Sequence, residues 1–371
     1  MKMDVVINGD SLIELKKIPN NSIDLIFADP PYWMRTTGTL KRVEGTEYDG
    51  VKEDWDKFNS LHEYTEFTKQ WLLECYRVLK KDGSIWVIGG MQCIYTIGSI
   101  MLEIGYWFVN DVIWHKSNPT PNFLGTRLNN SHETLIWATK DQKSNYHFNY
   151  KTAKELNREI GTIDLLKENQ KPKQLGSIWK MPVSSGNERL RDINGNKLHS
   201  TQKPESLLYK IIAISSEIGD LILDPFGGTM TTAAIAKKMG RHYISIEKEK
   251  KYCDYGLDRI ENTKVNIGDI EKAIFDIKPA KATIKDLINA KLLNVGDKFF
   301  MHKIEKEAIL NNNGKLVFKD IEYDIHTCAA IFRGVKAQRL NGFDYWLIKT
   351  ENGFESLSNL REKYRNSLIK T

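Results

Sequence analysis

Cysteine is scarce in this chain, and the four that occur lie far apart. They are Cys75, Cys93, Cys253 and Cys328 among 371 residues. No Cys-x-x-Cys pair is present, and no histidine stands at a spacing typical of a zinc site. The sequence therefore predicts free thiols that are buried or half-buried, and no metal site.

Long apolar stretches are also missing. No run approaches the roughly 20 residues that a membrane-spanning helix needs, and the N-terminus has no charged-then-apolar signal. The chain contains no internal repeat and no low-complexity tract. We expect a soluble, cytoplasmic protein that has no membrane partner.

Charge of one sign is in only slight excess. The formal net charge is +6 and the pI is about 8.8, which permits a polyanionic partner without requiring one. Apolar and charged residues are present in ordinary amounts, 41% and 27%, and 38 aromatic side chains (15 Tyr, 14 Phe, 9 Trp) are available for a core and for base stacking. The length of 371 residues predicts two domains.

Residues 1–263 alternate between strand and helix patterns. Apolar runs typical of strands cover residues 5–7, 23–28, 84–88, 106–114, 133–138, 221–223 and 242–246. Helical periodicity covers residues 12–18, 61–79, 91–104, 205–217, 230–239 and 248–262. We expect an α/β fold with a doubly wound, mostly parallel sheet.

Other segments interrupt this rhythm. Residues 33–60 predict a long functional loop, and residues 141–200 are polar and irregular, typical of an insertion. Lys81-Asp82-Gly83 is expected to end the helix that precedes the strand at 84–88. Residues 264–280 predict a linker. Residues 281–371 predict a small α+β domain, with a helix at 283–290 and strands at 315–318 and 343–348.

Asp29-Pro30-Pro31-Tyr32 follows the apolar run at 23–28, which predicts a buried parallel strand. The motif therefore lies at the carboxyl end of a strand, where open α/β sheets bind their ligands. A carboxylate, a rigid turn and an aromatic ring suit a planar base held by its exocyclic amine. We interpret the motif as part of a transferase that acts on a nucleobase amino group. The alternative is a turn stiffened by proline.

A second pattern runs from Asp224 to Thr229, where a short strand leads into a glycine turn that opens a helix. This arrangement is used to hold a polar or anionic cofactor at a helix N-terminus. Glu247 ends the next strand about twenty residues later, where an acid accepts hydrogen bonds from a ribose diol. The alternative is a structural turn and a glutamate that caps a helix.

Together, the two patterns resemble the DNA amino-methyltransferases that use S-adenosyl-L-methionine. The order, Asp-Pro-Pro-Tyr first and the glycine turn late, is that of the permuted beta group of adenine-N6 methyltransferases. The segments 8–11 and 199–204 match flanking motifs of that group. The segments 118–123 and 129–134, and 341–346 in the tail, resemble the HinfI and CcrM-like subgroup. The resemblance implies methylation of adenine in a GANTC-type site, with base flipping and S-adenosyl-L-methionine as cofactor.

The resemblance also assigns roles within the site. It implies that the catalytic residues are Asp29, Pro30, Pro31 and Tyr32, with Asp29 and the Pro30 carbonyl as acceptors for the target amine and Tyr32 stacked on the base. It implies that the cofactor is bound by Asp10, Asp29, Lys203, Asp224, Phe226, Gly228, Thr229 and Glu247. A surface lysine is the alternative interpretation of Lys203. The group usually has a second glycine where this chain has Met230, so the effect of Met230 on cofactor binding is left open.

DNA recognition is expected in an embedded region at about residues 116–200, with residues 281–371 as an accessory DNA-binding domain. The candidates for DNA contact are Lys41, Arg42, Asn118, Asn122, Arg127, Asn129, Asn130, Arg189 and Arg191. Arginine reads guanine and asparagine reads adenine well in the major groove, while each of these residues could instead contact phosphate or form loop surface. Trp346 is expected to pack in the core of the tail domain rather than to stack on a base.

Several alternatives stay open. A cytosine-N4 methyltransferase uses the same fold and more often has Ser at position 29. A glutamine-N5 protein methyltransferase usually has Asn there. A catalytically silent DNA-binding regulator is the alternative from outside the enzymes. Double-stranded DNA is the expected partner; a homodimer and a cognate restriction endonuclease are compatible with the resemblance, and the sequence does not decide between an orphan enzyme and a restriction-modification role.

Overall fold

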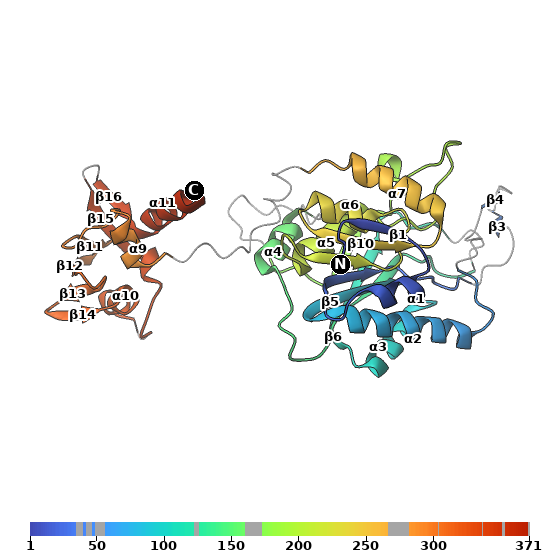
Figure 1. Ribbon diagram of the computed structural model, residues 1–371. Helices are drawn as coiled ribbons and strands as arrows, with labels where there is room; N and C mark the ends of the chain where they lie inside the picture. The colour runs from blue at the N-terminus through green and yellow to red at the C-terminus, as the bar shows by residue number, and fades with distance from the viewer. Residues whose placement is uncertain are drawn as a thin grey trace. The chain divides into compact units, whose positions relative to one another are not determined.

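The computed structural model describes residues 1–34, 40–41, 47–48, 56–121, 126–159, 173–265, 282–302, 304–335, 337–350 and 353–369. The chain divides into two compact units, Met1–Asp276 and Ile277–Thr371. Each unit has its own sheet and its own buried core (Figure 1).

The first unit is built on an eight-stranded sheet. The strands follow the spatial order β1 (Val5–Asn8), β10 (His242–Glu247), β9 (Leu221–Asp224), β2 (Ile23–Ala28), β5 (Leu79–Gly89), β7 (His132–Thr139), β6 (Trp107–Lys116) and β8 (Ile178–Met181). All neighbouring pairs are parallel except those that β7 makes with β5 and β6. The predicted doubly wound and mostly parallel sheet is therefore confirmed. A separate two-stranded ribbon joins β3 (Leu40–Lys41) to β4 (Glu47–Tyr48).

Helices cover both faces of this sheet (Figure 1). One face carries α1 (Ser11–Glu14), η1 (Leu15–Lys17), α2 (Leu61–Val78) and α3 (Ile94–Ile104). The other carries α4 (Tyr150–Glu159), α5 (Glu205–Ser215), α6 (Thr231–Lys238) and α7 (Lys250–Asn262). Strand β2 supplies both layers, because Leu25 and Phe27 face the α5 side while Ile26 and Ala28 face the α2 side.

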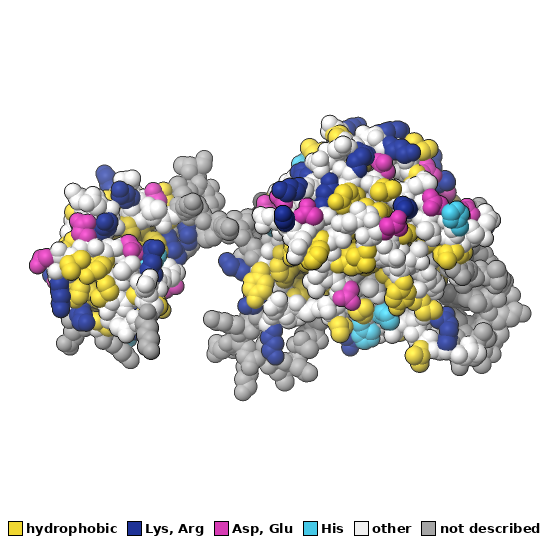
Figure 2. Space-filling model, turned by 90° about the horizontal axis from the view of Figure 1, so that it is seen from below, with side chains coloured by type: hydrophobic (Ala, Val, Ile, Leu, Met, Phe, Trp, Pro, Cys, Tyr) yellow, Lys and Arg dark blue, Asp and Glu magenta, His cyan; other side chains and the backbone are white. Residues whose placement is uncertain are grey.

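The surface of the first unit reflects the mild net charge. On the face drawn in Figure 2, Lys and Arg side chains lie among acidic side chains, with apolar side chains between them, rather than in one basic patch. None of the helices in the described ranges is long and apolar enough to cross a membrane.

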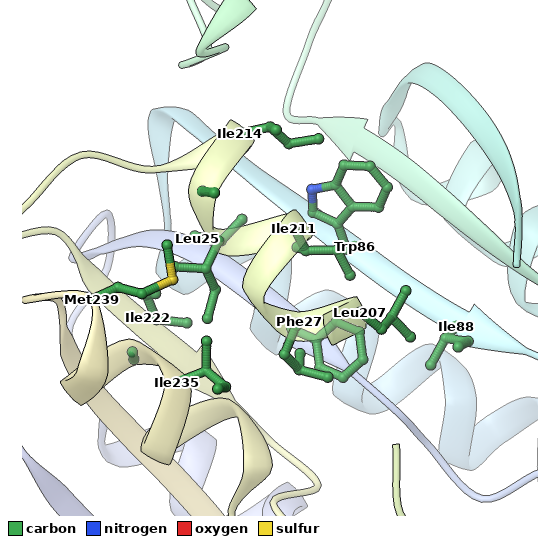
Figure 3. Close-up of a cluster of buried hydrophobic side chains, with 14 of the residues drawn as sticks. Leu25, Phe27, Trp86, Ile88, Leu207, Ile211, Ile214, Ile222, Ile235 and Met239 are labelled. Atoms are coloured by element: carbon green, nitrogen blue, oxygen red, sulfur yellow. The ribbon is translucent and has the colours of Figure 1, made fainter. Parts of the chain in front are cut away.

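The core on the α5 side is shown in Figure 3, where Leu207 and Ile211 of α5 approach Trp86 and Phe27 of the sheet. Trp86 is fully buried, stacks on Trp137 at 4.9 Å between ring centroids, and donates from its indole nitrogen to the Ser215 hydroxyl at 3.0 Å. Because large apolar side chains are buried on both faces of the sheet, the sequences of the central strands are continuous apolar runs. The four cysteines are buried and free, as the sequence predicts.

The prediction that residues 141–200 are irregular was wrong at two places. Residues 150–159 form α4, and residues 178–181 form β8, which extends the sheet by pairing in parallel with β6. Trp179 is buried in β8, and Asn149 ahead of α4 donates to the Ala213 and Ser216 carbonyls at 2.6 and 3.0 Å. These elements were missed because α4 is mostly polar and β8 is a run of only four residues.

The predicted stop signal at Lys81-Asp82-Gly83 was also wrong. Helix α2 ends at Val78, and the segment 81–83 belongs to β5, which starts at Leu79. A Cβ on Gly83 would lie 2.8 Å from the Asp24 carbonyl oxygen of β2. This glycine therefore allows two strands to approach closely rather than ending a helix.

The second unit is a six-stranded antiparallel sheet with helices. Its strand order is β14 (Ile321–Tyr323), β13 (Leu316–Phe318), β12 (Ile304–Leu310), β11 (Lys298–Met301), β15 (Trp346–Thr350) and β16 (Gly353–Ser356). Its helices are α9 (Ile284–Asn289), α10 (Ile325–Arg333), η4 (Gly342–Asp344) and α11 (Leu357–Ile369). The predicted α+β character and the helix near 283–290 are confirmed.

Two features of this unit differ from, or go beyond, the expected elements. The strand expected at 343–348 begins only at Trp346, because residues 342–344 form η4. Helices α10 and α11 were not predicted. Trp346 is fully buried and donates to the Ile325 carbonyl at 2.9 Å, so the prediction that it packs in the core is confirmed.

We predict that Gly83→Ala destabilises the first unit by about 1–3 kcal/mol, because its Cβ would collide with the backbone of β2. Gly176→Ala is the matched control, since a Cβ there meets no atom within 4 Å, and its effect should stay within about 0.5 kcal/mol. Thermal unfolding of the two variants measures the difference. Equal melting temperatures would contradict this account of Gly83.

Candidate active site

Four neighbouring strands end at one edge of the large sheet and bring four acidic side chains to it. Strands β1, β10, β9 and β2 are adjacent and parallel, so their carboxyl ends lie side by side. Asp10 follows β1, Glu247 ends β10, Asp224 ends β9 and Asp29 follows β2. Ligands of open α/β sheets bind at such an edge.

A pocket opens over these strand ends. It contains about 1120 Å³ of empty space, which includes its opening to solvent. All the residues expected for catalysis and for the cofactor line it, and the lining also includes Ser11, Asp56, His199, Gln202, Thr232 and Tyr252. Residues separated by as many as 242 positions, from Asp10 to Tyr252, thus share one cavity. Within the described ranges, no group of three or more His, Cys, Asp or Glu side chains could hold a metal ion.

The glycine turn is shaped by the carboxylate that precedes it. Asp224 accepts hydrogen bonds from the Phe226 backbone N–H at 3.0 Å and from the Thr232 hydroxyl at 2.5 Å. These bonds tie the start of the turn to helix α6. Burial raises the pKa of Asp224 to about 7, while the two hydrogen bonds oppose the rise.

Glu247 holds the middle of the same turn. One of its carboxylate oxygens accepts from the Gly228 N–H at 2.8 Å, and the other accepts from the Glu249 N–H at 2.8 Å. Burial raises the pKa of Glu247, and the backbone hydrogen bonds act against that rise. Because a carboxylate has about four acceptor positions, Glu247 can still accept bonds from two hydroxyl groups.

Met230 stands where the resembled group usually has a glycine, and its backbone has a positive φ of 58° at the N-cap of α6. Its side chain is fully buried and does not line the pocket. It fills a slot against α7, where a Cβ added to Gly256 would lie 2.2 Å from the Met230 Cγ. The methionine is therefore accommodated by packing away from the cavity, which leaves Gly228 and Thr229 exposed to it.

The turn after β2 is fixed by side chains from elsewhere in the chain. Asp56 accepts three backbone N–H bonds, from Tyr32 and Trp33 at 2.7 Å and from Met34 at 2.8 Å. The Tyr64 hydroxyl donates to the Pro31 carbonyl at 3.0 Å. These contacts hold Trp33 at a positive φ of 52°, a conformation that is costly for a bulky residue.

The Asp29 side chain is 16% exposed, and its two carboxylate oxygens have different surroundings. Its Oδ2 lies 2.7 Å from the Nζ of Lys203, whereas its Oδ1 is buried and has no hydrogen-bond partner in the described structure. Burial raises the pKa of Asp29, and the Lys203 ammonium opposes that rise. Lys203 is itself only 6% exposed, so the alternative of a surface lysine was wrong.

A second buried carboxylate lies beside this pair. Glu133 accepts from the Tyr32 hydroxyl at 2.8 Å and from Lys116 at 2.6 Å, and its other contact is Lys203 at 3.8 Å. Burial alone would raise the pKa of Glu133, but the Lys203 and Lys116 ammonium groups outweigh it and hold that pKa below its usual range. At Lys203, the charges of Asp29 and Glu133 outweigh the effect of burial and raise the pKa of the ammonium.

The sequence did not single out Glu133, Lys116, Asp56 or His199 as site residues. Lys116 ends β6 and Glu133 lies near the start of β7. Neither belongs to a short motif that indicates catalysis. His199 was noted only as part of a flanking motif; burial lowers its pKa to about 3, so the ring in the pocket wall is neutral. Only the packing of distant segments brings these side chains together.

The residues expected to contact DNA make different kinds of contact in the structure. Asn118 accepts from the Val183 N–H at 2.9 Å, Arg127 donates to Asn130 at 2.9 Å, and Arg191 donates to the Gly195 carbonyl at 2.7 Å. Asn129 lies in the same exposed segment as Arg127. Arg42 and Asn122 lie outside the described residues, as does the side chain of Lys41.

The guanidinium of Arg189 binds three backbone carbonyls. It donates to the carbonyls of Ser184 at 3.1 Å, His199 at 3.2 Å and Ser200 at 2.7 Å. These bonds fix the segment that leads to Lys203. The geometry favours a structural role for Arg189 over the expected contact with DNA.

Comparison with known proteins gives a consistent result. The family model described as DNA methylase matches residues 23–258. The chain is 46% identical over 364 residues to the Type II methyltransferase M.HinfI of Haemophilus influenzae, covering 98% of this chain and 97% of that protein. It is 36% identical over 258 residues to the Type II methyltransferase M2.DpnII of Streptococcus pneumoniae, covering 69% of this chain and 89% of that protein.

Among solved structures, the cytosine-N4-specific PvuII DNA methyltransferase is similar, with a TM-score of 0.51 and 21% identity over 72% of this chain and 90% of that one. A likeness at this level of identity supports the fold alone. It does not distinguish the target base.

We predict that Gly256→Ala lowers the melting temperature even though alanine normally stabilises a helix by about 1 kcal/mol relative to glycine. The cause is the collision with Met230, so in a Met230→Gly background the same change should be neutral or stabilising. Thermal unfolding of the two single variants and the double variant measures this reversal of sign. An equal loss in both backgrounds would refute the packing account.

Proposed function

Because this chain belongs to the DNA methylase family, we propose that it transfers a methyl group from S-adenosyl-L-methionine to N6 of adenine in double-stranded DNA. The proposed site is GANTC. The proposal for that site rests on the resemblance of residues 118–123 and 129–134 to the HinfI and CcrM-like subgroup.

The observation that carries the proposal is the unpaired Oδ1 of Asp29 in the wall of the pocket. A buried acceptor without a partner is costly, so it favours a ligand that donates a hydrogen bond there. The amino group of adenine is such a donor. The lone pair of this nitrogen is delocalised into the ring. Hydrogen bonds from the amino group to Asp29 and to the Pro30 carbonyl favour the tetrahedral geometry that transfer requires.

Tyr32 is suited to hold the base. Its ring lines the pocket, and its hydroxyl bonds to Glu133, which fixes the position of the hydroxyl end of the ring. An aromatic face of this kind stacks on a nucleobase that has left the duplex. We therefore propose base flipping, with Tyr32 on one face of the adenine and Asp29 at its edge.

The other end of the pocket suits S-adenosyl-L-methionine, which when bound supplies an activated sulfonium methyl group. Glu247 has acceptor positions left for a ribose diol, and Asp10 lies on the adjacent strand end. Phe226, Gly228 and Thr229 line the pocket, as does Asp224. No covalent enzyme intermediate is needed, because these residues only bind and orient the reacting groups.

Lys203 compensates the charge of Asp29. Its ammonium is bonded to Asp29 and lies 5.1 Å from the centre of the Tyr32 ring, so it neutralises the carboxylate that the amine approaches. A contact with the carboxylate of the methionine part of the cofactor remains part of the proposal. The pairing with Asp29 gives the clearer reason for a buried lysine here.

For DNA contact we propose Asn118, Arg127, Asn129, Asn130 and Arg191. The predictions for Lys41, Arg42 and Asn122 rest on sequence alone. A homodimer, a cognate restriction endonuclease, a cytoplasmic location and an accessory DNA-binding role for residues 281–371 also remain predictions from the resemblance.

The rival function is methylation of cytosine at N4, which uses the same fold. Asp at position 29 favours adenine. Incubation with labelled S-adenosyl-L-methionine and DNA, followed by digestion to nucleosides, distinguishes the two, and the expected product is N6-methyladenine. Recovery of N4-methylcytosine, or no transfer, would overturn the proposal, and methylome sequencing of an expressing host tests the GANTC site.

Asp29→Ala is expected to lower transfer by at least about 10²–10³-fold while DNA binding is retained, because the variant loses the acceptor for the amine. Labelled transfer and DNA binding should be measured on the same preparation. Asp254→Ala, which removes an exposed carboxylate paired with Lys250, is the control and should remain active. An Asp29→Ala enzyme that turns over normally would remove Asp29 from the reaction.

Lys203→Gln is expected to move the acid limb of the pH profile of kcat to higher pH. The ammonium opposes the rise that burial causes in the pKa of Asp29, so its loss lets that pKa rise further. Activity that depends on ionised Asp29 is then lost at a higher pH as the solution is acidified. Saturating cofactor removes effects on cofactor affinity, and Lys80→Gln, whose partner Asp24 is outside the pocket, is the control. An unshifted or lowered limb contradicts the assignment.

A further inference from the structure

Glu133 is a buried charge that the proposed reaction does not use directly. It does not line the pocket, yet it touches two residues that do, Tyr32 and Lys203. Its carboxylate side chain is only 12% exposed. A buried carboxylate is tolerated only where it is paired, so its retention beside the catalytic turn requires a reason.

The pairing around Glu133 is balanced. Two carboxylates, Asp29 and Glu133, face two ammonium groups, Lys203 and Lys116, with the closest contacts at 2.7 Å and 2.6 Å. The Tyr32 hydroxyl adds a hydrogen bond at 2.8 Å to the Oε2 of Glu133. Removal of any one charge would leave its neighbour uncompensated in a buried site.

The backbone anchors Glu133 firmly. Strand β7 carries it in the antiparallel register Trp114↔Glu133 with β6, and Lys116 N–H donates to the Ser131 carbonyl at 2.8 Å. Lys116 and Glu133 therefore flank residues 117–132, which include five of the nine DNA-contact candidates. Their ion pair joins the end of β6 to the start of β7.

We propose that Glu133 is a positioning residue that fixes the hydroxyl end of the Tyr32 ring and the position of the Lys203 ammonium, and that Lys116 anchors it. This inference rests on the proposed function and deepens it. Glu133 acts through its two neighbours, so its loss should impair the chemical step more than the binding of either substrate.

The first test is Glu133→Gln, which keeps the size of the side chain and removes its charge. We expect kcat to fall about 10–100-fold, with the KM values for S-adenosyl-L-methionine and DNA within about threefold of the wild type. Glu103→Gln is the matched control, because Glu103 is an exposed glutamate that pairs with Lys69 at 2.6 Å. Thermal unfolding of each variant ensures that folded enzymes are compared.

The second test is a double-mutant cycle with Tyr32→Phe, which keeps the ring and removes the hydroxyl. If Glu133 acts through that hydroxyl, Tyr32→Phe should cost several-fold in kcat in the wild type and less than about twofold in a Glu133→Leu background, which leaves the hydroxyl no acceptor at this position. Equal losses in both backgrounds, or a Glu133→Gln enzyme with full kcat, would overturn the inference.

The acid limb of the kcat profile provides a readout that a merely structural role would not move. The groups that face Asp29 are Lys203, Glu133, Tyr32, Cys93 and Asp224. Because the negative charge of Glu133 raises the pKa of Asp29, Glu133→Gln should move the acid limb to lower pH, opposite to Lys203→Gln. A shift to higher pH, or none, contradicts the inference.

Failure of the proposed function is distinguishable from failure of this inference. A folded wild-type enzyme that transfers no methyl group to adenine refutes the proposed function and the inference together. Wild-type transfer combined with an unimpaired Glu133→Gln enzyme refutes the inference alone. Lys116→Gln, which removes the anchor but keeps the Glu133–Tyr32 bond, is the second variant if Glu133→Gln does not fold, and it should lower kcat by a smaller factor; unchanged kcat in that variant counts against the inference.

Discussion

The buried ion pair between Asp29 and Lys203 is the interaction on which the rest of the site depends. It joins the turn after β2 to the segment ahead of α5, which lies 174 residues further along the chain, at an Nζ to Oδ2 distance of 2.7 Å. Neither charge is stable in such a place without the other. With Oδ2 engaged, Oδ1 is left buried without a hydrogen-bond partner in the described structure.

The sheet makes this pairing compatible with a cofactor site. Because β1, β10, β9 and β2 are neighbours and parallel, their ends form one continuous edge, and Glu247 and Asp224 each organise part of the glycine turn from below. Met230 fits this turn only because Gly256 of α7 lacks a side chain. A departure from the usual sequence is thus absorbed on the far side of the turn from the pocket.

Prediction from the sequence was successful where a local pattern had a single physical cause. Strands buried on both faces read as apolar runs, and β2 and β10 were predicted within one residue of their bounds. The prediction failed where the cause was tertiary. Strand β8 is a run of only four residues, Ile178–Met181, which is too short to be recognised without its pairing to β6. Gly83 is needed for contact with β2 rather than to end a helix.

The sequence by itself determined the fold class, the order of the two motifs and the identity of the pocket residues at the strand ends. It did so because strand periodicity and glycine or proline turns act over a few residues. Only the tertiary structure decided that Glu133 and Lys116 belong to the site and that Lys203 is bound to Asp29. Charge compensation between Asp29 and Lys203 depends on the distance between segments 174 residues apart, and no local pattern encodes that distance.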